Sequence, residues 1–203
     1  AQQVREQLKQ KGVFLVNLMS SPGSGKTTLL KRIIQDMKED YAIGVMEADI
    51  DSDVDAVSIE KTGAKAIQVH TDGMCHMDAG MTKTSLEETG VDDLDLVFLE
   101  NVGNLICPAE YDTGAVKKVM ILSVPEGDDK PLKYPLMFAE SDVLVISKID
   151  ALPYFDFDMD KCKERALYLN KNIQIFPVSA KTGQGMEELE NWLKQEVHLW
   201  KEG

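Results

Sequence analysis

Short apolar runs alternate with stretches of amphipathic, helix-like periodicity along the whole chain. The apolar runs cover residues 13–19, 42–46, 66–69, 96–99, 119–124, 143–146 and 173–178. Helical spacing of apolar residues is clearest from Leu29 to Met37 and from Met186 to Trp200. Such strands, with helices between them, predict a mostly parallel sheet covered on both faces. We therefore expect a doubly wound α/β fold, with one domain over residues 1–203 and a surface helix at residues 1–11.

Composition excludes several classes of partner. A chain of 203 residues can bury one substantial core. Its formal net charge of -13 repels nucleic acid and anionic membranes, so we expect neither as a partner. No apolar run approaches the roughly 20 residues of a membrane helix. Three cysteines are too few, and odd in number, for a disulfide framework, which favours the reducing cytoplasm.

Residues 20–27 read Ser-Ser-Pro-Gly-Ser-Gly-Lys-Thr, between the first apolar run and the first amphipathic stretch. They match the phosphate-binding pattern GxxxxGK[ST] except at Ser20. Glycines in this loop let backbone N–H groups face a phosphate, Lys26 reaches the β- and γ-phosphates, and the Thr27 hydroxyl ligates Mg²⁺. The nucleotide-binding residues expected here are Gly23, Ser24, Gly25, Lys26, Thr27 and Thr28.

Acidic side chains stand at the ends of two later apolar runs. Asp49 and Glu100 are candidates to help hold Mg²⁺, although Asp49 could instead only cap a turn. Residues 100–103, Glu-Asn-Val-Gly, stand where many such hydrolases carry DxxG, whose glycine N–H senses the γ-phosphate. The expected catalytic group is Lys26, Thr27, Asp49, Glu100 and Gly103.

Base recognition is predicted from two further motifs. Residues 147–150, Ser-Lys-Ile-Asp, match NKxD except at Ser147, and residues 179–181, Ser-Ala-Lys, follow the next apolar run. The Asp150 carboxylate can accept hydrogen bonds from guanine N1–H and the exocyclic amine, whereas adenine would leave it unpaired. We therefore predict GTP and GDP as ligands. The base-binding residues are Ser147, Lys148, Asp150, Ser179, Ala180 and Lys181.

Arginines are scarce. The chain has three, Arg5, Arg32 and Arg165, and none lies in a switch-like loop. Without an internal arginine finger, hydrolysis of GTP to GDP and phosphate is expected to be slow.

Cys75-His76 and Cys107 form a possible second site. Two thiolates and an imidazole suit Ni²⁺ or Zn²⁺, with a fourth ligand from water, Asp78 or another subunit in a symmetric dimer. From chemistry alone, small buried thiols beside a surface histidine are an equally good interpretation. The other cysteine and the other histidines are expected to be structural: Cys162, His70 and His198.

Four segments together resemble the hydrogenase nickel-incorporation GTPases, the HypB family of the signal-recognition and MinD-related (SIMIBI) P-loop class. They are NLMSSPGSGKTT at 17–28, CHMDA at 75–79, ENVGNLICP at 100–108 and KPLKYP at 130–135. The resemblance covers nearly the whole chain and implies a GTP-dependent metallochaperone that helps to load nickel into [NiFe]-hydrogenase.

The resemblance also implies a ligand set and partners. Cys75, His76 and Cys107 would bind Ni²⁺ or Zn²⁺, and GTP would promote a homodimer. Partners would be the zinc-containing accessory protein HypA and the hydrogenase large-subunit machinery. Some family members carry an N-terminal cysteine- or histidine-rich nickel segment, which this sequence lacks; it opens at Ala1 rather than Met, as a trimmed chain would.

A coupling hypothesis follows from the spacing of Gly103 and Cys107. Three residues separate them, so nucleotide state could move Cys107 while Cys75-His76 stays fixed. Three alternatives remain. A urease accessory GTPase would carry Cys-Pro-His, a small-molecule kinase would carry a mobile basic lid, and a nucleotide-gated scaffold would not hydrolyse GTP at all.

Overall fold

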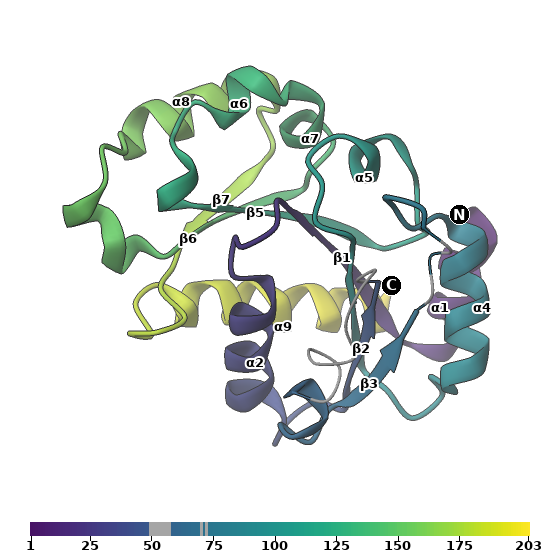
Figure 1. The fold of residues 1–203 in the computed structure, drawn as a ribbon. Helices are drawn as coiled ribbons and strands as arrows, with labels where there is room; N and C mark the ends of the chain where they lie inside the picture. Colours follow the sequence, from purple (N-terminus) through teal and green to yellow (C-terminus); the bar gives the residue numbers. More distant parts are fainter. Residues whose placement is uncertain (49–57, 70, 72) are drawn as a thin grey trace.

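The computed structural model describes residues 1–48, 58–69, 71 and 73–203. These residues contain a seven-stranded sheet in the order β3-β2-β4-β1-β5-β6-β7, with every neighbouring pair parallel (Figure 1). The strands are β1 Phe14–Ser20, β2 Ile43–Glu47, β3 Lys65–Gln68, β4 Leu96–Glu100, β5 Lys117–Ser123, β6 Val143–Ser147 and β7 Gln174–Pro177. Each of the seven expected strands is present, which confirms the doubly wound α/β fold.

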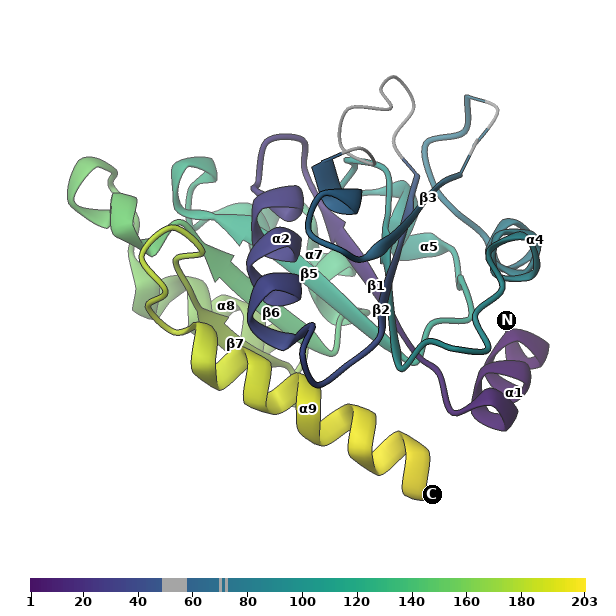
Figure 2. The same cartoon turned by 90° about the horizontal axis from the view of Figure 1, so that it is seen from below.

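Helices cover both faces of this sheet. They are α1 Gln2–Lys11, α2 Lys26–Met37, α4 Ala79–Thr89, α5 Cys107–Glu110, α6 Lys130–Lys133, α7 Pro135–Ala139, α8 Met159–Leu169 and α9 Met186–Glu202, with 3-10 turns η1 Val124–Glu126 and η2 Ile149–Tyr154. Helices α2 and α9 pack on one face, and α1, α4, α5, α7 and α8 pack on the other (Figures 1 and 2). Within the described ranges, no helix is both long and apolar enough to cross a membrane.

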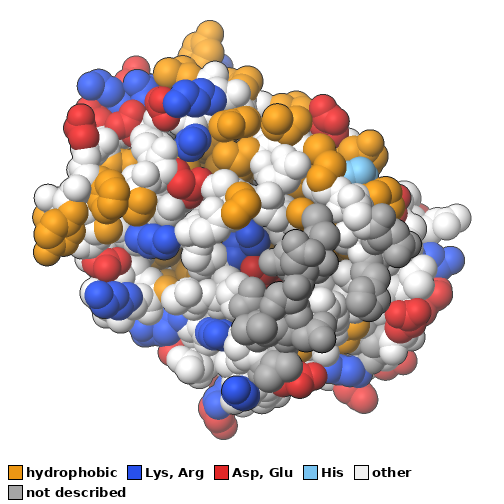
Figure 3. All heavy atoms as spheres, in the orientation of Figure 1, with side chains coloured by type: hydrophobic (Ala, Val, Ile, Leu, Met, Phe, Trp, Pro, Cys, Tyr) orange, Lys and Arg blue, Asp and Glu red, His pale blue; other side chains and the backbone are white. Residues whose placement is uncertain are grey.

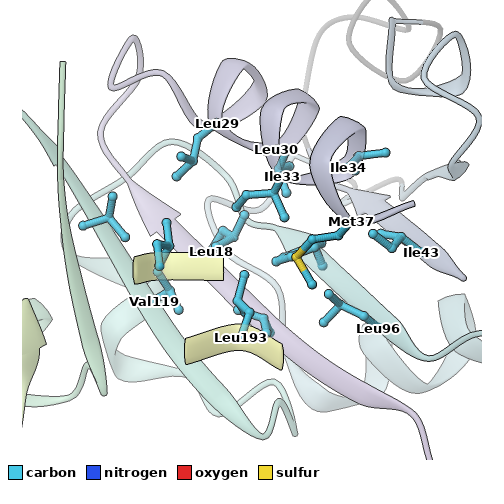
Figure 4. Close-up of a cluster of buried hydrophobic side chains, with 14 of the residues drawn as sticks. Leu18, Leu29, Leu30, Ile33, Ile34, Met37, Ile43, Leu96, Val119 and Leu193 are labelled. Carbon is cyan, nitrogen blue, oxygen red and sulfur yellow. The ribbon is translucent and has the colours of Figure 1, made fainter. Parts of the chain in front are cut away.

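The core explains why β1 is mostly apolar. Successive strand residues point to opposite faces, and β1 is buried on both. Leu18 packs toward α2 and α9, where Figure 4 shows it near Ile33 and Leu193. Leu15 and Met19 pack in the opposite layer.

The carboxyl edge of the sheet collects the motif residues. Parallel strands end at the same edge, and β1 lies between β4 and β5. Leu18 is in register with Glu100, and Ser123 with Ser147. The phosphate loop, the Glu100 segment and the Ser147 segment therefore follow neighbouring strand ends, where ligands bind in open α/β sheets.

Residues 100–118 contain one short helix, although their sequence shows no helical periodicity. The single-turn helix α5 begins at Cys107, with Pro108 in its first turn. The Asn104 side-chain oxygen accepts hydrogen bonds from the backbone N–H groups of Ile106 (2.8 Å) and Cys107 (3.3 Å). This local cap forms a turn that is too short to produce hydrophobic periodicity.

Candidate nucleotide and metal site

The phosphate loop joins the end of β1 to the start of α2. Gly23 and Gly25 have φ values of 75° and 96°, in the left-handed region where a β-carbon is unfavourable. The loop therefore needs glycine at both positions, and α2 presents its N-terminus to the same space. Backbone N–H groups at a helix N-terminus favour a bound anion, as the motif predicts.

Ser20 stands where the standard pattern has glycine, and its hydroxyl is used inside the loop. Lys26 Nζ donates to Ser20 Oγ at 2.9 Å, and Ser24 Oγ donates to the same oxygen at 2.6 Å. The lysine is thus held over the loop by a neutral hydroxyl, which the more negative oxygens of a phosphate can replace.

Thr27 and Glu100 are brought together from α2 and β4. Thr27 Oγ1 lies 3.1 Å from Glu100 Oε1, and Glu100 is buried. Hydroxyl and carboxylate oxygens are ligands that fit Mg²⁺. Asp49, the other candidate, lies outside the described residues.

Gly103 lies against the phosphate loop. A β-carbon at this position would be 3.0 Å from Pro22 Cγ and 3.1 Å from Pro22 N. Residues 100–103 therefore run beside the loop that would hold the phosphates, as a γ-phosphate sensor must.

A cleft of about 240 Å³ lies next to the phosphate loop and is lined by all of the predicted base-binding residues except Ser179. Asp150 Oδ1 accepts a hydrogen bond from Ser179 Oγ at 2.7 Å, so the two base motifs are in contact. Lys148, with a left-handed φ of 59°, donates from Nζ to Gly23 O at 2.7 Å. The lining residues are Ser24, Gly25, Thr28, Leu29, Ser147, Lys148, Asp150, Ala151, Ala180 and Lys181.

Ser147 lines the cleft and also contacts the phosphate loop. It is buried, and its hydroxyl donates to the carbonyl of Ser24 at 2.8 Å. The side chain therefore ties the base-binding loop to the phosphate loop.

The three possible metal ligands meet beside α5. Cys75 Sγ lies 2.8 Å from Cys107 Sγ and 3.9 Å from His76 Nδ1, and all three cysteines of the chain are free thiols. The His76 ring is stacked on Tyr111, with 3.6 Å between centroids. Across the described residues no three His, Cys, Asp or Glu side chains form a complete metal cage. The two thiols are in hydrogen-bond contact, and the His76 imidazole lies beside them, stacked on Tyr111.

The surroundings of Cys75, His76 and Cys107 affect both the protonation of the thiols and their exposure. The hydrogen bond with Cys75, together with burial, raises the pKa of the Cys107 thiol, so metal binding must displace a proton there. Asp78 caps α4, accepting from Met81 N at 2.9 Å, and is engaged in that role. Exposed apolar side chains of Met74, Ile106 and Tyr111 surround the thiols, and Figure 3 shows hydrophobic side chains gathered around a histidine on this face.

Cys162 and His198 lie in surroundings that suit a structural role. Cys162 is fully buried in α8, where burial raises its pKa to about 12. His198 is exposed and lies 3.3 Å from Glu202, and His70 lies outside the described residues.

The three arginines are engaged with residues outside the phosphate loop. Arg5 pairs with Asp112, and Arg165 pairs with Asp128. Arg32 pairs with Asp36 and also donates to Ala180 O at 3.4 Å.

Two residues with no predicted role are central to this geometry. Asn101 is buried and hydrogen bonds across three segments. Glu126 caps η1 and accepts a hydrogen bond from Ser21 of the phosphate loop. The capping pattern Ser123-x-x-Glu126 is a signal that could have identified Glu126. Asn101 has no comparable local signal.

Comparison with known proteins agrees with this geometry. The sequence matches the model of the CobW/HypB/UreG nucleotide-binding domain over residues 14–177. The hydrogenase maturation factor HypB of Rhizobium leguminosarum bv. viciae is 47% identical over 190 residues, which are 94% of this chain and 64% of that protein. The chain thus spans less than two thirds of that relative's length.

Two crystal structures are similar over nearly all of this chain. HypB from Helicobacter pylori in complex with nickel has a TM-score of 0.90 and 38% identity, covering 97% of this chain and 92% of that one. The hydrogenase maturation factor HypB from Archaeoglobus fulgidus has a TM-score of 0.91 and 37% identity, covering 97% and 96%.

Proposed function

Because the chain belongs to the CobW/HypB/UreG nucleotide-binding family, and within it to the HypB hydrogenase maturation factors, we propose that it is a GTP-hydrolysing metallochaperone for nickel. The main support for the proposal is that one continuous segment runs from Glu100 to Cys107. Glu100 and Gly103 contact the phosphate loop, and Cys107 contacts the thiol of Cys75. One short segment therefore reaches both a nucleotide site and a pair of soft metal ligands.

GTP is the proposed nucleotide. Asp150, oriented by Ser179, would accept from guanine, and Lys148 would lie over the purine ring. Lys26 would exchange its Ser20 partner for phosphate oxygens and neutralise charge that develops on the transferred group. Thr27 and Glu100, with Asp49, would hold Mg²⁺, which would supply positive charge to the phosphate site. Since the paired arginines lie elsewhere, hydrolysis would be slow.

Nickel is the proposed cargo, with Zn²⁺ as a possible competitor at the same donors. The similar nickel-bound HypB of Helicobacter pylori supports this choice. Cys75 and Cys107 would supply two thiolates, and His76, which stacks on Tyr111, would supply the imidazole. Three ligands leave room to receive and release an ion, which suits delivery better than permanent storage.

A GTP-promoted homodimer would complete the site. The thiols lie on the surface within a rim of Met74, Ile106 and Tyr111, so a second copy could cover them and add ligands. HypA and the hydrogenase large subunit would receive or supply the ion, in a reducing cytoplasm that keeps the thiols free.

Nucleotide hydrolysis provides the first test. Wild type should hydrolyse GTP in preference to ATP, below about 1 s⁻¹. Lys26→Ala should abolish hydrolysis, and Asp150→Asn should weaken GTP binding about tenfold or more, the value of a hydrogen bond to a charged group. Both are measured by phosphate release and nucleotide titration. Equal use of ATP and GTP, or an ATP-dependent transfer to a small molecule, would favour a kinase instead.

Metal titration provides the second test. Ni²⁺ and Zn²⁺ are titrated into wild type and Cys107→Ala with GDP and with a non-hydrolysable GTP analogue. Wild-type Ni²⁺ affinity should differ between the nucleotides, and Cys107→Ala should lose at least about tenfold in affinity. Cys162→Ala is the matched control, because its thiol is buried in α8. Nickel affinity that is the same with both nucleotides contradicts gating.

A further inference from the structure

Asn101 lies directly after β4, in the middle of the proposed γ-phosphate sensor, and is only 1% exposed. Its side-chain oxygen accepts hydrogen bonds from Met77 N at 3.2 Å and from Val102 N at 2.9 Å. Its amide nitrogen donates to Asn17 Oδ1 at 3.1 Å. The side chain thus joins the sensor segment to β1 and to the residue that follows Cys75-His76.

The hydrogen bonds determine which atom of the Asn101 side-chain amide is the oxygen and which is the nitrogen. Two backbone N–H groups converge on one side-chain atom of Asn101, so that atom must be the oxygen. The nitrogen then faces Asn17, which is fully buried on the central strand. Asn101 is therefore anchored to the rigid core on one side and holds the Met77 backbone on the other.

We propose that Asn101 is the positioning residue that couples nucleotide state to the Cys75-His76 loop; the inference rests on the proposed function. Residues 100–103 respond to the γ-phosphate through Gly103, which contacts Pro22. Asn101 passes the displacement to Met77 and hence to the adjacent His76 and Cys75.

A separate link reaches Cys107 through the chain. Asn104 follows Gly103 and caps the turn that begins at Cys107, accepting from its N–H at 3.3 Å. The two thiols are therefore connected to the same sensor by different side chains. The Cys75-His76 loop moves with the nucleotide rather than staying fixed while Cys107 moves. Asn101 and Asn104 can be removed independently, which makes the two links separable.

The test measures each thiol by itself, with the other cysteine replaced by serine, because the two sulfurs lie 2.8 Å apart and labelling of one would alter the other. Metal-free protein is treated with N-ethylmaleimide in the presence of GDP or of a non-hydrolysable GTP analogue. Peptide mass spectrometry then measures the rate at which Cys75 and Cys107 are labelled. In otherwise wild-type protein both labelling rates should change with the nucleotide. Asn101→Ala should abolish the response of Cys75 and leave that of Cys107. Asn104→Ala, the matched control, should do the reverse.

A conservative variant separates coupling from folding. Asn101→Asp keeps the oxygens that accept from Met77 and Val102. Asn17 Nδ2, buried with no hydrogen-bond partner among the described residues, can turn to donate to the new carboxylate. Asn101→Asp should therefore retain the Cys75 response. If Asn101→Ala fails to fold, Asn101→Leu removes the acceptor while keeping the side-chain volume.

The outcomes distinguish failure of the Asn101 relay from failure of the proposed function. If Cys75 still responds to nucleotide in folded Asn101→Ala or Asn101→Leu, the relay is overturned and the proposed function stands. Loss of both responses in those variants also overturns it, because Asn101 then supports the sensor as a whole. If neither thiol responds in otherwise wild-type protein, nucleotide gating in the proposed function fails, and the relay fails with it.

Discussion

Gly103 has no room for a side chain, because the atoms nearest to an added β-carbon include backbone atoms of Pro22 in the phosphate loop. Backbone cannot move aside as a flexible side chain can. Gly103→Ala should therefore lower the free energy of unfolding by about 1–3 kcal/mol, as overpacking does, and weaken binding of a GTP analogue. Urea unfolding and nucleotide titration measure the two effects.

Gly80→Ala is the control for this substitution. Gly80 lies in α4, and its added β-carbon would approach only the side-chain oxygen of Asp78, at 3.2 Å. Alanine is also the better helix former, by about 1 kcal/mol. Equal loss of stability in both variants would show that the contact between Gly103 and Pro22 has no special importance.

At the level of single residues, the sequence was informative where a motif fixes the backbone. The loop glycines, Lys26 and Asp150 lie where their patterns indicated, because strand–loop–helix geometry places them regardless of the rest of the chain. The partner of Ser147 and the three contacts of Asn101 depend on segments distant in sequence. No local pattern encodes such contacts.

The short turn η1 supports the phosphate loop from the end of β5. The Glu126 carboxylate accepts from the N–H and the hydroxyl of Ser123, both at 2.7 Å, and also from Ser21 Oγ. Glu126→Ala should lower the free energy of unfolding by about 0.5–2 kcal/mol, the usual cost of losing a cap, and also weaken GTP binding. Thermal unfolding and nucleotide titration are the measurements.

Glu187→Ala is the control for the Glu126 variant. Glu187 is an exposed acidic residue in the first turn of α9, far in sequence from the phosphate loop. Its loss should leave GTP affinity unchanged. A Glu126 variant that binds GTP as tightly as the Glu187 variant would contradict a supporting role for η1.

The strands and the long helices were predictable, and the single-turn helix was not. The seven strands could be expected because each lies in a short apolar run, and α2 and α9 because their apolar residues recur at helical spacing. Helix α5 has four residues and depends on the cap from Asn104. Its sequence carries turn chemistry but no period.

Stability of the whole molecule should vary with pH through the packing of α2 against α9. Burial, followed by the neighbouring Asp36, raises the pKa of Glu190 from 4.5 to about 7, against the opposing influence of Arg32 and Lys194. Between these pH values the folded protein holds a proton that the unfolded chain has released. The stabilisation is therefore complete below about pH 4.5 and is lost as the pH rises through about 7.

Glu190→Gln imitates the protonated carboxyl at every pH. Its stability relative to wild type should increase between about pH 5 and pH 8, measured by urea unfolding at both values. The control is Glu188→Gln, at an exposed residue of the same helix. A constant difference between Glu190→Gln and wild type across this range would contradict the assignment.

The central place of β1 in the sheet also determines when the protein can begin to work during its synthesis. The ribosome makes β1 first among the strands, yet Phe14 pairs with Leu96 and Ser20 pairs with Ile121. The nascent phosphate loop therefore lacks its two neighbouring strands until β4 and then β5 have been made. Its apolar strand must wait unpaired, where chaperones can bind it. Capacity to bind nucleotide should consequently appear late and abruptly as the growing chain is lengthened past β5.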